Sequence, residues 1–98
     1  MERYKTRNLD ITGRLSIPGE LRIALNIEAG SNIFLTCIDT IVAIHRAEGD
    51  AGTACAVSHI NDTGMISLPA EVKKKMGWKE KARIAMYHTD KLIILKSA

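Results

Sequence analysis

The side chains best suited to chemistry in this chain of 98 residues are cations beside a tight turn and in a short run. Arg14 directly follows Gly13, and glycine permits a positive φ, so the guanidinium is expected on a protruding loop. A planar guanidinium suits base edges and narrow minor grooves of DNA. Lys73, Lys74 and Lys75 form a run suited to sequence-independent attraction of phosphates. These cations predict a surface that binds duplex DNA.

The two halves of the chain differ in the kind of cation that they carry. Residues 1–49 hold five arginines and one lysine against six acidic residues, whereas residues 50–98 hold seven lysines and one arginine against five acidic residues. The net charge of +3 therefore comes from the second half. Arginine and lysine interact differently with phosphates and bases, so the halves are expected to share a fold without sharing a role.

The chain repeats itself at an offset of 51 residues. The segment TGRLSIPGELRIAL at 12–25 corresponds to TGMISLPAEVKKKM at 63–76 without a gap. We therefore assign a first repeat at 1–47, a connector at 47–53 and a second repeat at 54–98. A unit of about 50 residues is marginal alone, so both repeats are expected to complete one core in a single domain over 1–98, or to complete cores with a second chain.

Each repeat is expected to contain two strands, a short helix and a hairpin. Short alternating apolar segments joined by Gly, Asp and Asn turns predict the strands, and Pro18 and Pro69 stop a strand and suit the first turn of a helix. The fold class is thus mostly β with short helices (α+β), built from two tandem β-β-α-β-β repeats. The expected strands lie at 4–9, 14–17, 32–38 and 41–45 in the first repeat and at 54–60, 65–68, 83–88 and 92–96 in the second.

The helices are expected to end near Asn26 and Gly77, because both residues tolerate the left-handed conformation. A buried stripe is predicted from Leu21, Ala24 and Leu25 in the first helix and from Val72 and Met76 in the second. Arg22 and Lys73 then face away from the stripe.

Both copies resemble a known family of DNA-binding modules. GRLSIPGELR in the first copy, and GMISLPAEVKKKMGW with the later LIILK in the second, are similar to the pattern of the AbrB/SpoVT swapped-hairpin family. The resemblance implies a looped-hinge helix fold in which two modules interlock hairpins into a small β-barrel. One chain supplies both modules here, as in MraZ-like relatives, which implies a pseudo-dimer. Homo-oligomers, by pairing of pseudo-dimers or by exchange of hairpins, stay open.

The resemblance also implies which cations contact DNA. The family presents arginines from the first strand, the turn and the outer face of the helix, and in the first copy these positions are Arg7, Arg14 and Arg22. The family's second helix arginine is replaced here by Ile23. The corresponding second-copy positions are Ser58, Met65, Lys73 and Lys74, with Arg3, Lys5 and Lys75 as weaker candidates. The first copy is expected to supply most of the selectivity and the second most of the affinity.

Other classes of protein have less support in the sequence. Motifs of enzymes are missing, so no catalysis and no cofactor is expected. Cys37 and Cys55 are expected to be buried thiols, and the histidines at 45, 59 and 88 lack the spacing of metal ligands, although Cys37 and His88 occupy equivalent places and a contact between them is a hypothesis to check. No stretch is apolar enough for a membrane span and the first residues are too polar for a signal peptide, so a cytoplasmic location is expected.

The sequence thus favours a transcriptional regulator that binds duplex DNA and is selective for sequence or shape. The alternative is a protein-interaction module, such as an antitoxin of the MazE type, although that class usually has a disordered segment beyond its last strand and this sequence offers none. A weaker alternative is a small-ligand or redox sensor that uses Cys37 or Cys55.

Overall fold

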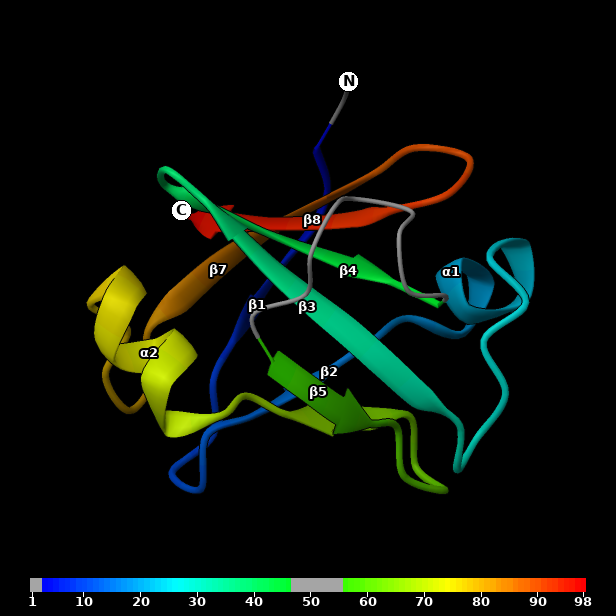
Figure 1. Cartoon of the computed structure of the whole chain (residues 1–98), viewed down its shortest axis with the longest axis horizontal. Coiled ribbons are helices and arrows are strands. Elements are labelled where there is room, and N and C mark those ends of the chain that lie inside the picture. Colours follow the sequence, from blue (N-terminus) through cyan, green and yellow to red (C-terminus); the bar gives the residue numbers. More distant parts are fainter. Residues whose placement is uncertain (1–2, 47–55) are drawn as a thin grey trace.

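The computed structural model describes residues 3–46 and 56–98, so the connector expected at 47–53, together with Cys55, lies outside the described residues. Within these ranges the chain is mostly β with two short helices, as the sequence predicts, and the order β-β-α-β-β occurs twice (Figure 1). The elements are β1 (Arg3–Asn8), β2 (Arg14–Ser16), α1 (Gly19–Ala24), β3 (Asn32–Ile38), β4 (Ile41–His45), β5 (Ala56–His59), β6 (Met65–Ser67), α2 (Ala70–Met76), β7 (Arg83–His88) and β8 (Ile93–Ser97).

The strands of one half of the chain pair with the strands of the other half. A six-stranded sheet has the order β1-β7-β8-β4-β3-β5, and β2 and β6 form a separate two-stranded sheet. Within each half only the hairpins β3–β4 and β7–β8 pair, whereas β1–β7, β3–β5, β4–β8 and β2–β6 all join the halves, and every one of these pairs is antiparallel. Neither half therefore completes its sheet without the other.

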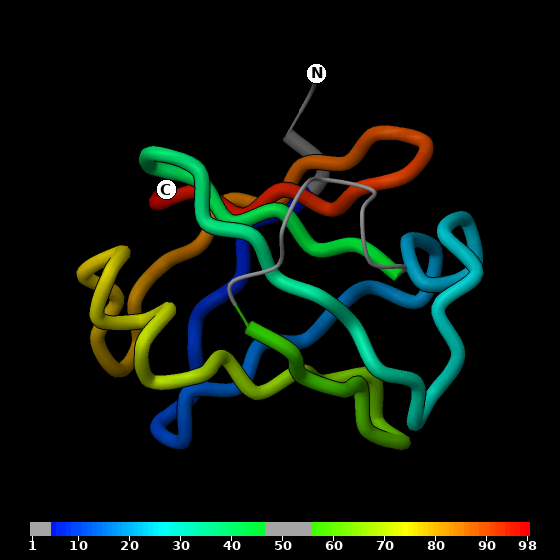
Figure 2. Tube along the Cα trace, viewed as in Figure 1, coloured from blue at the N-terminus to red at the C-terminus, as the bar shows by residue number. Residues whose placement is uncertain are grey.

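The β2–β6 pair, here called the ribbon, runs along one side of the molecule (Figure 1). Turn 10–13 precedes β2 and α1 follows it, while turn 61–64 precedes β6 and α2 follows it. Because the two strands are antiparallel, each end of the ribbon combines the turn of one half with the helix of the other, and the helices lie on opposite sides of the molecule (Figure 2). Backbone hydrogen bonds fix this arrangement, from Leu68 N to Gly13 O at 3.0 Å and from Ile17 N to Gly64 O at 2.9 Å.

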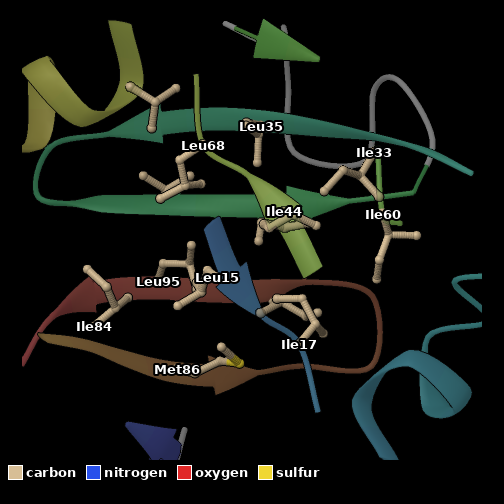
Figure 3. Packing of buried hydrophobic residues seen from close by; sticks show 14 of the residues in the cluster. Leu15, Ile17, Ile33, Leu35, Ile44, Ile60, Leu68, Ile84, Met86 and Leu95 are labelled. Atoms are coloured by element: carbon tan, nitrogen blue, oxygen red, sulfur yellow. The ribbon is translucent and has the colours of Figure 1, made fainter. Parts of the chain in front are cut away.

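The core lies between the two hairpins and the ribbon (Figure 3). Leu15 and Ile66 of the ribbon are opposite one another in the register and both are fully buried. They pack in one cluster with side chains from the hairpins, such as Leu35, Ile44 and Leu95. Burying a large aliphatic side chain contributes roughly 1.5–3 kcal/mol, so the ribbon is anchored mainly through its inward-facing residues. Its other residues are left at the surface.

Each helix begins after a proline and ends in a left-handed residue. Asn26 has φ +56° and Gly77 has φ +70°, as expected from the sequence. Backbone bonds from Ile27 N to Arg22 O at 2.8 Å and from Trp78 N to Lys73 O at 2.9 Å close the two last turns. Such closure satisfies carbonyls that would otherwise lack partners at a helix end.

The predicted buried stripes are only partly correct. Leu21, Leu25 and Val72 are buried and Met76 is half-buried, but Ala24 is exposed. Ala24 is the last residue of α1, and the core contacts at this end of the helix are made by the neighbouring Leu25 and by Ile27. Strands β3, β4 and β7 have the predicted bounds, whereas β1, β2, β6 and β8 differ by one residue at one or both ends. Among the described residues, no helix has the length and hydropathy needed to cross a membrane.

Candidate nucleic-acid interface

Turn 10–13 holds Arg14 through the carboxylate of Asp10. Asp10 Oδ1 accepts hydrogen bonds from Thr12 N at 2.9 Å, Thr12 Oγ1 at 2.8 Å and Arg14 N at 2.8 Å. Asp10 Oδ2 then pairs with Arg14 Nε at 3.1 Å, and that Nε also lies 3.0 Å from Thr12 Oγ1. One oxygen of the carboxylate therefore shapes the turn, and the other orients the arginine.

The same contacts keep Asp10 ionised. The backbone N–H of Arg14 and then the hydroxyl of Thr12 lower the pKa of Asp10 from 3.8 to about 2, with smaller help from the Arg14 side chain and the Thr12 backbone. The Arg14 side chain is 44% exposed. No hydrogen bond joins its Nη groups to residues 3–46 or 56–98, so these donors stay available to a ligand while the stem is held in place. Such preorganisation suits bidentate contact with a phosphate or a base edge.

Turn 61–64 has the same shape without the ion pair. Asn61 Oδ1 accepts hydrogen bonds from Thr63 N at 3.0 Å, Thr63 Oγ1 at 2.8 Å and Met65 N at 3.0 Å. Gly13 and Gly64 have φ of +78° and +81°, so both turns use glycine in the left-handed region. Where Met65 replaces the arginine, an amide replaces the carboxylate. The turn itself thus needs only one acceptor oxygen, which makes the second oxygen of Asp10 specific to Arg14.

A helix cation of each half lies over the turn glycine of the other half. A Cβ placed on Gly64 would meet the Cζ of Arg22 at 2.8 Å and its Nε at 2.9 Å. On Gly13 it would meet the Nζ of Lys73, with Cε at 3.2 Å and Cδ at 3.3 Å. Both cations are half-buried, and Arg22 Nε also donates to Ile17 O at 3.2 Å. The expectation that Arg22 and Lys73 simply face away from the core is therefore incomplete, because each side chain folds over a turn.

These contacts group the predicted site residues by end of the ribbon rather than by repeat. Arg14 and the lysines of α2 belong to one end, and Arg22 belongs to the other. We call the first the cationic end, and it has a net charge of +3; the corresponding positions form the neutral end, where Arg22 and Asp62 cancel. The cationic end comprises Asp10, Ile11, Arg14, Lys73, Lys74 and Lys75, and the neutral end comprises Asn61, Asp62, Met65, Arg22, Ile23 and Ala24.

The two ends also differ in the charge of their exposed helix residues. Lys74 and Lys75 are exposed on α2, whereas the equivalent Ile23 on α1 is 83% exposed and uncharged. Glu20 and Glu71 lie in the first turns of α1 and α2, so each lowers the charge beside its own end by one and leaves the difference of three charges between the ends unchanged. The distance between the ends follows from the register: Gly64 is bonded to Ile17, four residues beyond Gly13, which is about 13 Å of extended chain.

The remaining predicted cations lie on the edge strand β1. Arg7 is half-buried, and its Nε is buried without a hydrogen-bond partner among the described residues. Lys5 is exposed. Arg3 also lies in β1, but a shift in register between Arg3 and Lys5 breaks the regular alternation expected along this strand.

The cysteine and histidines considered as possible ligands lie outside the ribbon. Cys37 is half-buried rather than buried, because it packs against the core cluster without being part of its buried centre. The proposed Cys37–His88 contact is wrong, since β4 and β8 lie between the strands that carry these residues. His45 is buried and lies 2.9 Å from Thr36 Oγ1 through its Nε2. Within the described ranges, no group of three or more potential ligands could hold a metal ion.

Two features of the site were missed at the sequence level, namely the role of Asp10 and the contact of each helix with the opposite turn. The first had a local signal, because Asp10-Ile-Thr-Gly13 and Asn61-Asp-Thr-Gly64 share an Asx residue two positions before a threonine. The second had none, since residues 13 and 73, or 22 and 64, are far apart in the chain. The chain matches no family model, no curated protein and no solved structure.

Proposed function

We propose that this protein is a duplex-DNA-binding transcriptional regulator of the AbrB/SpoVT type. The observation that carries the proposal is the cationic end, where a preorganised arginine of one half lies in a turn that is covered by Lys73, from the lysine-bearing helix of the other half. DNA presents about one negative charge per 1.7 Å along its axis, so an end of the ribbon that carries three more positive charges than the other end favours phosphate contacts. The unequal distribution of charge between the two ends of the ribbon matters more here than the modest net charge of the whole chain.

The strand pairing also supports this assignment. Outside the hairpins β3–β4 and β7–β8, every strand pair joins the two halves and is antiparallel. Together with a ribbon to which both halves contribute a strand, this pairing fits the swapped-hairpin barrel that the sequence resemblance implies. We propose that the chain is a pseudo-dimer of this kind, with its two tandem repeats in one domain. In this proposal the ribbon and its turns face the DNA.

The candidate residues at the two ends of the ribbon have roles that follow from their positions and contacts. Arg14 donates its Nη groups to a base edge or phosphate while Asp10 holds Nε. Lys73, Lys74 and Lys75 contact phosphates as point charges, and Arg22 contacts the backbone from the other end of the ribbon. The ends are about 13 Å apart, which is close to the roughly 12 Å width of the major groove.

The proposal is tested by fluorescence anisotropy with a mixed pool of labelled duplexes over a series of salt concentrations. Wild type is expected to bind with a steep salt dependence. In Lys73→Ala the slope of log K against log salt concentration should become smaller by about 0.9 for all fragments alike, and Arg14→Ala should lose its preference among fragments. Lys91→Ala is the matched control, because Lys91 is exposed in the loop between β7 and β8 rather than on the ribbon. Absence of wild-type binding at low salt, or equal losses with Lys91→Ala, would refute the proposal.

A further inference from the structure

We infer that the protein binds DNA in one preferred orientation, on a site whose base-specific contacts lie on one side only. This inference rests on the proposed function and concerns how the two ends of the ribbon divide the work. A binder with two identical ends gains the same energy when it is turned around on its site. Here, turning the chain around exchanges the cationic end for an end that carries three fewer positive charges.

The first step of the argument is the difference between the two turns. Arg14 is held by Asp10 through Nε and its side chain is 44% exposed, whereas Met65 occupies the same place in the second turn and is half-buried. A guanidinium can donate to guanine O6 and N7 in the major groove, and a thioether has no donor. Base discrimination by a guanidinium of the turns is therefore restricted to the cationic end.

The second step is the difference between the two helices. Lys73 and Arg22 both lie over a glycine, so each end keeps one helix cation in the same place. The next helix position is Lys74 at the cationic end but Ile23 at the neutral end, where it is 83% exposed. Phosphate contacts by the helices are thus also concentrated at the cationic end, and at the neutral end Arg22 is the helix residue that contacts a phosphate.

The third step is the connection between the ends. The ribbon is anchored to the core by buried side chains, and backbone bonds at Gly13 and Gly64 join it to both turns. The ends therefore cannot reorient independently over their separation of about 13 Å. A rigid ribbon whose two ends bind DNA with different strength favours a DNA site without two-fold symmetry, in contrast to the palindromic sites of symmetric dimers.

The experiment compares two tethered cleavage reagents. Ile11→Cys at the cationic end and Ile23→Cys at the neutral end are matched, because both residues are isoleucines that are exposed by 69% and 83%. Each variant, in a Cys37→Ser, Cys55→Ser background, carries an iron–EDTA group and is bound to a duplex selected from a random pool. We expect the Ile11→Cys reagent to cleave one flank of the site and the Ile23→Cys reagent to cleave the opposite flank. Cleavage of both flanks by each reagent would overturn the inference.

A second measurement uses the native cysteines and the equivalent residues of the two turns. Arg14→Ala is expected to weaken binding to the selected duplex by about tenfold or more, and Met65→Ala by less than about threefold. Equal losses would also overturn the inference. Failure of the proposed function has a different result, because the wild type would then bind no duplex at all, whereas failure of the inference leaves binding intact without a preferred orientation.

Discussion

The contact of Arg22 with the turn of the other half predicts an unusually large cost for Gly64→Ala. Gly64 has φ +81°, and a left-handed conformation costs a residue with a Cβ roughly 1–2 kcal/mol. The new Cβ would also lie 2.8–2.9 Å from Cζ, Nε and Nη2 of Arg22, so the guanidinium must move. Its movement endangers the hydrogen bond from Arg22 Nε to Ile17 O, and we expect a further loss of about 1 kcal/mol.

Gly77→Ala is the control that separates these two costs. Gly77 has φ +70°, but nothing lies within 4 Å of a Cβ placed there, so only the backbone cost applies. In a domain of this size 1 kcal/mol corresponds to about 4–8 °C in Tm. Gly64→Ala should therefore melt about 4–8 °C below Gly77→Ala.

The assay is urea denaturation followed by the fluorescence of Trp78, which is the single tryptophan and is 5% exposed. The decisive sample is the double variant Gly64→Ala, Arg22→Ala, since removing the guanidinium removes the collision. In the Arg22→Ala background, Gly64→Ala should then lower the free energy of unfolding by no more than Gly77→Ala lowers it in the wild type. Strict additivity of the two substitutions, or equal stability of Gly64→Ala and Gly77→Ala, would refute the contact.

Three further predictions concern the turn and the core. Arg14→Met should raise the pKa of Asp10 above about 2 but keep it below 3.8 in an NMR titration, because backbone N–H and Thr12 donors remain; a return to 3.8 would contradict this. Folding lowers the pKa of Asp10, so the stabilising effect of its ionised carboxylate is complete above the unfolded value of 3.8 and is lost as the pH falls through about 2. The Tm of Asp10→Asn should therefore depend less on pH than the wild-type Tm between these two pH values. Thr36→Val should cost about 1 kcal/mol in urea denaturation by removing the 2.9 Å contact with His45, and no loss would show that this contact is dispensable.

Local patterns predicted the elements well. Hairpin β3–β4 was predictable because the apolar run 32–38 and the run 41–45 flank a two-residue turn, and the observed bounds of both strands agree. The positive φ of Gly13 and Gly64 followed from the turn chemistry, and the ends of both helices followed from Asn26 and Gly77. Each of these features depends on neighbours in the chain, which the sequence displays directly.

The composition of the site was less predictable, because it depends on which strands pair. The 51-residue offset shows that Arg22 and Lys73 are equivalent, but it does not show that each crosses to the turn of the opposite half. An assignment by repeat therefore placed Arg14 and Arg22 in one functional unit, whereas the antiparallel ribbon separates them. The role of Asp10 was not predicted for another reason. An Asx turn accounts for an aspartate at this position, and only the structure shows that its second oxygen, Oδ2, accepts a hydrogen bond from Arg14 Nε.

The measurement that tests the account most directly is an NMR titration of the isotopically labelled protein with a short duplex at moderate salt. We expect the largest changes in amide shift at Gly13, Arg14 and Lys73, smaller changes around Arg22, and none in the loop at 89–92. The changes should disappear at high salt, as phosphate contacts require. Changes centred on that loop or on the β3–β4 hairpin, or no changes at any salt concentration, would contradict DNA binding through the ribbon.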